Sequence, residues 1–302
     1  LNLATSSVSG LGIGINQFSW TISNGTCPSV ADTVEIEVLA LPPVANAGTD
    51  QQICTNTSVL GGNNPGGATG TWSVAAGSAI FANANQFNSG VSGLSPGTNT
   101  FVWTIDNGVC TPTTDTVDIV VDAVPPVANA GPDQQLCNTA TLLAGNAPAP
   151  GTGTWTLISG SGTIVTPGQF NSSFSGIGAG ANVLVWEVGN GSCPVTTDTV
   201  VITRDLAPSP AVAGANQTLC DTVSVFTATP PAIGTGTWAL LSGSGIPVNL
   251  NLATSSVSGL GIGINQFSWT INNGTCPSVA DTVEIEVLAL PAIANAGTDQ
   301  QI

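Results

Sequence analysis

The sequence repeats itself at a fixed period of 83 positions, and its least common large side chains follow that period. The seven tryptophans form two series at this spacing: Trp20, Trp103, Trp186 and Trp269, and Trp72, Trp155 and Trp238. The seven cysteines form two more: Cys27, Cys110, Cys193 and Cys276, and Cys54, Cys137 and Cys220. Such a chain is expected to fold as an array of similar units, each contacting mainly its neighbours.

A longer repeat lies over the short one. Residues 1–53 recur at 250–302, an offset of 249 or three short periods, with changes only at Ser23, Pro43 and Val44. Neighbouring repeats differ far more than repeats three apart. We therefore expect the copied unit to be a block of three repeats, and the chain to be a segment of a longer array.

Proline-rich joints separate the repeats, because proline stiffens a short connection. They predict three complete domains at 44–126, 127–209 and 210–292. Residues 1–43 are then the C-terminal part of a repeat, and 293–302 the start of the next.

Within a repeat the pattern is that of short strands. Residues 101–105 alternate apolar and polar side chains, Asn107-Gly108 favours a tight turn, and 115–121 alternate again, which predicts a hairpin. Residues 57–60, 70–74 and 79–81 are further expected strands. About seven short strands per repeat predict an all-β fold, a tandem array of Ig-like β-sandwich domains.

The charge excludes several function classes. One Arg, no Lys and no His stand against 17 acidic residues, a formal net charge of -16, which disfavours nucleic acid and anionic membranes as partners. No apolar run reaches the roughly 18 residues of a membrane span. Without His or Lys, and without a phosphate-binding loop, we predict no catalytic residues, no metal site, no cofactor and no enzyme activity.

The regular cysteines predict disulfides and an extracytoplasmic compartment. The favoured pairing is within each repeat, Cys54 with Cys110, Cys137 with Cys193 and Cys220 with Cys276, which gives Cys27 a partner before Leu1. One objection is that the first strand of an Ig-like sandwich ends at the pole opposite the last hairpin. A bond from Cys27 to Cys54 across the joint is the alternative.

The tryptophans lie at the inward phase of alternating strands, so we predict that all seven form the cores of the repeats. The alternative, a sugar-stacking platform, requires neighbouring exposed aromatic side chains.

Three recurring motifs together suggest a family. They are Val44-Ala-Asn-Ala-Gly-Thr-Asp-Gln-Gln-Ile-Cys54, the Gly-Thr-Trp motif, and an Asn-Gly-x-Cys turn followed by Asp-Thr-Val. Over its whole length the chain resembles the PKD-like and Ig-like repeats of giant Bacteroidota surface adhesins, such as gliding-motility adhesins of the SprB type. That resemblance implies a stalk exported by the type IX secretion system to the bacterial outer-membrane surface.

Two further sites follow from these motifs. Bacteroidota O-glycosylation uses an Asp-Ser/Thr-apolar motif, so the resemblance implies candidate O-glycosylation sites at Thr33, Thr116, Thr199, Thr282 and Thr222. A turn Asp followed by ordinary strand residues is the alternative. Structural calcium at the joint is disfavoured, since Asp50 and Asp133 are matched by Asn216 in the third complete repeat.

The expected function is therefore the structural stalk of a very long extracellular adhesin or fibre, serving attachment or gliding. Its partners are neighbouring repeats and other fibres, with an unknown ligand at the distal end. The alternative is a subunit of a pilus-like filament, assembled without covalent bonds by strand exchange. A carbohydrate-binding module is a third reading.

Overall fold

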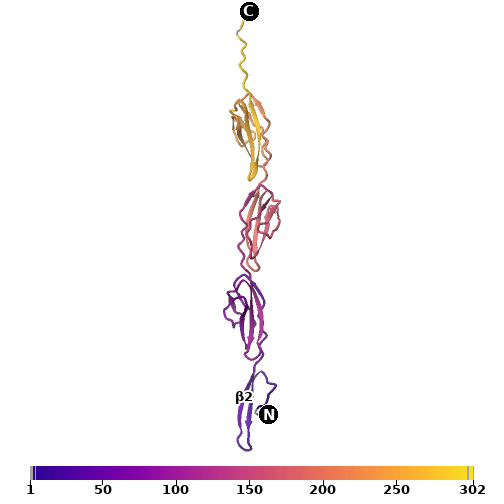
Figure 1. The fold of residues 1–302 in the computed structure, drawn as a ribbon, viewed down its shortest axis with the longest axis vertical. Helices are drawn as coiled ribbons and strands as arrows, with labels where there is room; N and C mark the ends of the chain where they lie inside the picture. The colour runs from indigo at the N-terminus through magenta and orange to yellow at the C-terminus, as the bar shows by residue number, and fades with distance from the viewer. Residues whose placement is uncertain (1–2, 4, 298, 302) are drawn as a thin grey trace. The chain divides into compact units, whose positions relative to one another are not determined.

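The computed structural model describes residues 3, 5–297 and 299–301, and every regular element in them is a β-strand. The strands form three two-sheet sandwiches and one two-stranded sheet (Figure 1). The two-stranded sheet pairs β1 (Gly14–Ile22) with β2 (Val30–Val38), antiparallel. The all-β prediction is thus confirmed.

The first sandwich has seven strands in two sheets. A four-stranded sheet has the order β3-β9-β8-β5, and a three-stranded sheet has the order β4-β7-β6. The strands are β3 (Gln51–Ile53), β4 (Thr57–Val59), β5 (Thr69–Ala76), β6 (Ile80–Phe81), β7 (Gly90–Ser92), β8 (Gly97–Asp106) and β9 (Thr113–Val121).

The second sandwich repeats this arrangement, with sheet orders β10-β16-β15-β12 and β11-β14-β13. Its strands are β10 (Gln134–Leu136), β11 (Ala140–Leu142), β12 (Thr152–Ser159), β13 (Thr163–Ile164), β14 (Ser173–Ser175), β15 (Gly180–Gly189) and β16 (Thr196–Arg204).

The third sandwich has sheet orders β17-β23-β22-β19 and β18-β21-β20. Its strands are β17 (Gln217–Leu219), β18 (Val223–Val225), β19 (Thr235–Ser242), β20 (Ile246–Pro247), β21 (Ser256–Ser258), β22 (Gly263–Asn273) and β23 (Cys276–Val287).

This strand order is Ig-like. The second, fifth and fourth strands of each sandwich form one sheet, and the third, sixth and seventh form the other, as in immunoglobulin domains. The first strand joins the last one in parallel. Each sandwich has its own apolar cluster, to which both of its sheets contribute.

The segment that enters each sandwich runs beside the strand that leaves it. In the first sandwich Ala47 N donates to Asp115 Oδ2 at 2.8 Å, Asp118 N donates to Asp50 Oδ1 at 2.9 Å, and Gln51 pairs with Ile119. We call residues 45–53, 128–136 and 211–219 the entry segments, and β9, β16 and β23 the exit strands.

Six of the seven tryptophans are core residues, as predicted. Trp72 and Trp103 face each other across β5 and β8 with ring centroids 4.8 Å apart, and the other two sandwiches repeat the pair at 5.0 Å. Trp20 lies on the two-stranded sheet of β1 and β2 and is 40% exposed, so its place in the core of a repeat stays a prediction.

The Gly-Thr-Trp motif has a packing reason. A Cβ on Gly70, Gly153 or Gly236 would lie within 2.2 Å of the tryptophan ring on the neighbouring strand. Only glycine leaves room for that ring.

A buried asparagine is the polar centre of each sandwich. Asn182 is fully buried, and its amide donates to the carbonyls of Gly178, Gly180 and Ile202 while its Oδ1 accepts from Ser161 N. Asn99 and Asn265 have the same environment. Each of these side chains thus links backbone groups of two loops to the backbone of the exit strand.

By contacts the chain divides into two compact units. Unit 1 contains Leu1–Pro126 with Ala149–Thr152 and Gly189–Val195, and unit 2 contains Val127–Pro148, Gly153–Val188 and Thr196–Ile302. The turn between β15 and β16 is therefore part of unit 1. The domain boundaries predicted at the proline-rich joints stay a prediction.

Candidate functional site at the repeat joints

Two disulfides join consecutive repeats. Cys54, just after β3, is bonded to Cys193 in the turn before β16, and Cys137, just after β10, is bonded to Cys276 at the start of β23. The Cα atoms are 4.8 and 4.9 Å apart, within the usual range for a disulfide. Each bond closes a sequence separation of 139 residues.

This connectivity corrects the within-repeat pairing of Cys54 with Cys110, Cys137 with Cys193 and Cys220 with Cys276. The physical reason is the parallel pairing of entry segment and exit strand. Cys54 follows Ile53, which lies beside Val121, whereas Cys110 precedes the other end of β9. At strand rise those two ends are roughly 25–30 Å apart, far beyond the reach of a disulfide.

The alternative bond between Cys27 and Cys54 is also wrong. Cys27, Cys110 and Cys220 are free thiols, and Cys27 and Cys220 are exposed. The regular spacing correctly indicated disulfides, but the period fits bonds within a repeat and bonds to the next repeat equally well. Disulfides are typical of extracytoplasmic proteins, so the chain is an extracellular protein.

The aspartate that follows exit strand β9 or β16 accepts hydrogen bonds from the hairpin turn that leads into the exit strand of the following repeat. In unit 1, Ser192 donates from its backbone N at 2.6 Å and from its Oγ at 2.8 Å to Asp122 Oδ2, and Gln52 Nε2 donates to the same carboxylate at 3.0 Å. In unit 2, Thr275 and Gln135 bind Asp205 in the same way. These residues were not predicted, although Gln52 and Asp122 recur one period later as Gln135 and Asp205.

The turns have little room for any other geometry. Gly191 and Gly274 both have φ of +52°, and a Cβ there would lie within 2.2 Å of the Asp122 or Asp205 carboxylate. The Asn-Gly turn is thus confirmed, and its glycine is required both by the positive φ and by the close approach of the aspartate. Beside it, Asn190 Nδ2 donates to Ala123 O at 2.8 Å.

The hydrogen bonds at the joints lower both aspartate pKa values. Donation from the Ser192 backbone, then from the Ser192 hydroxyl and Gln52, lowers the pKa of Asp122 below its ordinary value. For Asp205, the Thr275 backbone lowers the pKa most, and the Thr275 hydroxyl and Gln135 add to this effect against an opposing desolvation. Both carboxylates are therefore ionised at neutral pH.

The joints are of two kinds. At the positions equivalent to Asp122 and Asp205, one period earlier and one later, the chain has Leu39 and Leu288. The turn residue equivalent to Ser192 and Thr275 is Val109 at the joint that follows Leu39, and the position of Gln52 and Gln135 is taken by Thr218 in the third repeat. The bond from Asn107 Nδ2 to Ala40 O, 2.7 Å, is kept at the leucine joint.

The aspartate of the Asp-Thr-Val motif has a structural role. Asp115, Asp198 and Asp281 each accept a hydrogen bond at 2.8 Å from the backbone of the entry segment. The threonines that follow, and the two further candidates, are exposed on the described chain: Thr33, Thr116, Thr199, Thr222 and Thr282. Their O-glycosylation stays a prediction.

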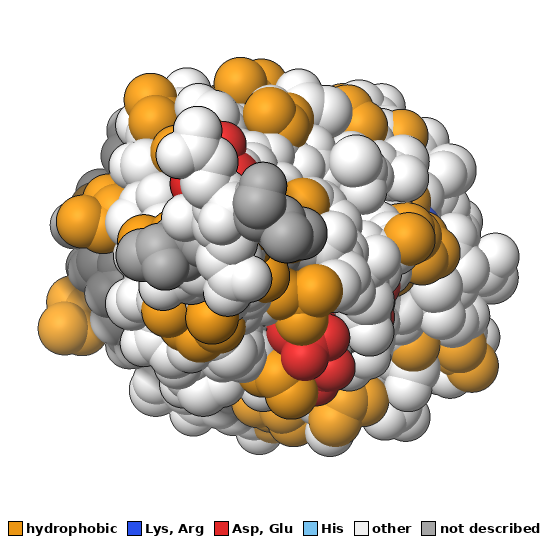
Figure 2. All heavy atoms as spheres, turned by 90° about the horizontal axis from the view of Figure 1, so that it is seen from above, with side chains coloured by type: hydrophobic (Ala, Val, Ile, Leu, Met, Phe, Trp, Pro, Cys, Tyr) orange, Lys and Arg blue, Asp and Glu red, His pale blue; other side chains and the backbone are white. Residues whose placement is uncertain are grey.

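The aspartates considered for calcium have a similar role. Asp50 Oδ1 and Asp133 Oδ1 accept from the backbone of the exit strand at 2.9 and 2.8 Å, and Asn216 Oδ1 does the same at 3.0 Å. An acceptor oxygen is all that this position requires, which explains the exchange of Asp for Asn. Among the described residues there is no group of three or more His, Cys, Asp or Glu side chains suited to a metal ion. In the view of Figure 2, acidic side chains make up a small part of the visible surface.

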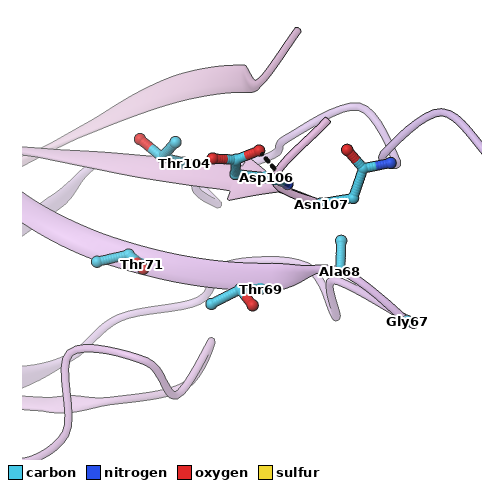
Figure 3. A pocket seen from close by; sticks show the side chains of 8 residues that line it. Gly67, Ala68, Thr69, Thr71, Thr104, Asp106 and Asn107 are labelled. Carbon is cyan, nitrogen blue, oxygen red and sulfur yellow. Dashed lines mark hydrogen bonds between the residues drawn. The ribbon is translucent and has the colours of Figure 1, made fainter. Parts of the chain in front are cut away.

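An open groove of about 410 Å³ lies along β5 and β8 of the first sandwich. Figure 3 shows its polar side chains, Thr69 and Thr71 from β5 and Thr104 and Asp106 from β8. The Asp106 carboxylate accepts from Gly108 N at 2.7 Å, and the equivalents of Asp106 are Gly189 and Asn272. The carboxylate of this groove is thus particular to one repeat.

The described residues contain no helix that is long and apolar enough to cross a membrane. No protein-family model matches the chain, and no curated protein matches it either.

Solved structures with a similar fold include tandem immunoglobulin proteins. A three-domain titin segment is 12% identical with a TM-score of 0.49, covering 82% of this chain and 99% of that one. The N-terminal eight domains of Down syndrome cell adhesion molecule are 12% identical with a TM-score of 0.48, covering 91% and 40%. Sidekick-1 domains 1–5 are 10% identical with a TM-score of 0.41, covering 88% and 65%. At such values the fold assignment rests on the strand order described above.

Proposed function

We propose that the chain is part of the stalk of a very long extracellular adhesin or fibre, with a structural and non-enzymatic role. The observation behind this proposal is the covalent bond at consecutive joints, Cys54 to Cys193 and Cys137 to Cys276. A disulfide between repeats resists separation of the repeats, which is what a protein that transmits force over many domains requires.

The composition fits this role. A surface with 17 acidic residues and one Arg offers few cleavage sites to trypsin-like proteases outside the cell. The motif resemblance adds the finer proposal that the fibre belongs to the outer-membrane surface of a bacterium, is exported by type IX secretion, and serves attachment or gliding. Neighbouring repeats are its main partners, and other fibres are further ones.

A second candidate is a filament subunit that assembles by strand exchange. In such a filament a strand from one molecule completes the sheet of its neighbour.

A boiled, reduced denaturing gel of fibres sheared from the producing cells, probed with an antibody to one repeat, separates the two candidates. The stalk proposal expects a band of several hundred kilodaltons, because the array is one covalent chain. A band near the 29.9 kDa of this sequence would overturn the stalk and leave the filament subunit.

A further inference from the structure

We propose that tension along the array is carried by two side-by-side covalent lines of extended chain linked by disulfides, and that the five middle strands of every sandwich lie outside the load path. This inference deepens the proposed stalk function and rests on it for its biological use. Its physical content follows from the order of the cysteines and the pairing of two strands.

Between the cysteine of a hairpin turn and the next cysteine along the chain there are only extended segments. The stretch from Cys193 to Cys220 comprises exit strand β16, the proline-rich joint and the entry segment 211–219. The stretches from Cys27 to Cys54 and from Cys110 to Cys137 have the same length and the same parts. Each stretch is a strand, a short connection and another extended segment, without a hairpin.

The disulfides connect these stretches to one another. The stretch that ends at Cys54 continues through its disulfide into the stretch that begins at Cys193, and 139 residues of backbone are bypassed. The stretch that ends at Cys137 continues in the same way at Cys276. Alternate stretches therefore join into one covalent line, and the remaining stretches join into a second.

Both covalent lines pass through every sandwich side by side. In the second sandwich the entry segment belongs to the line through Cys137, and exit strand β16 belongs to the line through Cys193. Gln134 pairs with Ile202 and Leu136 with Arg204 in parallel, and Ala130 N donates to Asp198 Oδ2 at 2.8 Å. Because the two strands run in the same direction, tension acts on both along their own backbones.

The consequence is an array that lengthens little when a sandwich opens. A β-strand already rises about 3.3 Å per residue, close to the maximum of about 3.6 Å for a stretched chain. Unfolding the middle strands, β11 to β15 in the second sandwich, releases no length to a line that bypasses them. Without the disulfide, the 139 bypassed residues would add roughly 500 Å.

Single-molecule pulling on the oxidised chain tests this inference. Handles are attached at the exposed thiols of Cys27 and Cys220 in a Cys110→Ser variant, which removes the third free thiol. The load path then consists of the stretches from Cys27 to Cys54 and from Cys193 to Cys220, so the extension should stop at about 190 Å. After reduction it should increase by roughly 500 Å.

Three results would overturn the load path. Within-repeat disulfides would bond Cys220 to Cys276, so no handle would attach at Cys220. An extension well beyond about 190 Å before reduction would show that no disulfide bypasses the middle strands. A Cys54→Ser/Cys193→Ser variant in the same background should extend several times further without reductant, and an unchanged limit would contradict the assignment.

The stalk function and the load path are tested by separate results. If the pulling limit holds but sheared fibres give only the small band on the reduced gel, the stalk function is wrong and the load path stands.

Discussion

Residues 14–38 and 263–287 have nearly the same sequence in two different surroundings. Both form an antiparallel hairpin with the same register, Trp20 opposite Asp32 and Trp269 opposite Asp281. Yet Trp20 is 40% exposed and Trp269 is fully buried. The hairpin thus depends on local pattern and turn, whereas burial depends on partner strands, here β17 and β19 beside β23 and β22.

The turns of the two hairpins differ as well. In the third sandwich the pairing extends to Asn273 and Cys276, and the turn is bonded to Cys137 and Asp205. In the first hairpin the pairing ends at Ile22 and Val30, and Cys27 is free and exposed. The same turn sequence is therefore fixed only where the preceding repeat supplies its cysteine and aspartate.

The largest expected difference between the two copies is the reactivity of the turn cysteine, Cys27 or Cys276, toward a thiol reagent. In the unreduced chain, unfolded in guanidinium, iodoacetamide should alkylate Cys27, Cys110 and Cys220 and leave Cys276 unmodified, because Cys276 has no thiol. Mass spectrometry after cleavage before Asp and after Glu should find peptide 50–105 linked to 188–197, and 133–187 linked to 221–280. A link from 50–105 to 106–114 would show the within-repeat bond instead.

Replacing Trp269 or Trp20 by alanine should change the stability of its own copy by different amounts. Trp269→Ala removes a fully buried ring that packs on Trp238, and we expect a loss of about 3–5 kcal/mol in the third sandwich. Trp20→Ala should change the stability of the first hairpin by less than about 1 kcal/mol, as for other exposed sites. Amide hydrogen exchange in β22 and β1 measures both, and equal losses would contradict the comparison.

Adding the strands that precede the second copy should also bury Trp20. Fusing residues 210–249 in front of Leu1 restores the sequence that precedes the second copy, since residue 250 begins the recurrence. The added strands should then bury Trp20, which shifts its fluorescence to the blue and protects it from acrylamide quenching. A fusion of the same segment in scrambled order is the control, and no change with the native order would show that burial needs more than these strands.

The smallest expected effect is the pH dependence of the joint. Hydrogen bonds lower the folded-state pKa of Asp205 below its ordinary value of 3.8, so their stabilisation is complete above pH 3.8 and is lost as pH falls through the lower folded value. The amide resonance of Thr275 should report this titration in the oxidised chain. In an Asp205→Asn variant the transition should vanish, and the equivalent turn at Thr26, which has no aspartate partner in this chain, should show none.

Much of one repeat could be predicted from the sequence. The hairpin of residues 101–121, the tight turn at Asn107-Gly108 and six buried tryptophans follow from alternation and turn chemistry, which are properties of neighbouring residues. Strands β3 and β7 were not among the expected strands.

The joint could not be predicted in the same way. The sequence alone determined the repeat, the all-β fold, the presence of Asn216 where the other repeats have Asp50 and Asp133, and the presence of disulfides. Only the tertiary structure decided which cysteines meet, and that Asp122 and Asp205 bind the turns that contain Ser192 and Thr275. The reason is that a periodic sequence shows which positions recur but not which repeat supplies the partner of a given cysteine. A disulfide depends on which ends of two parallel strands lie within about 7 Å in space.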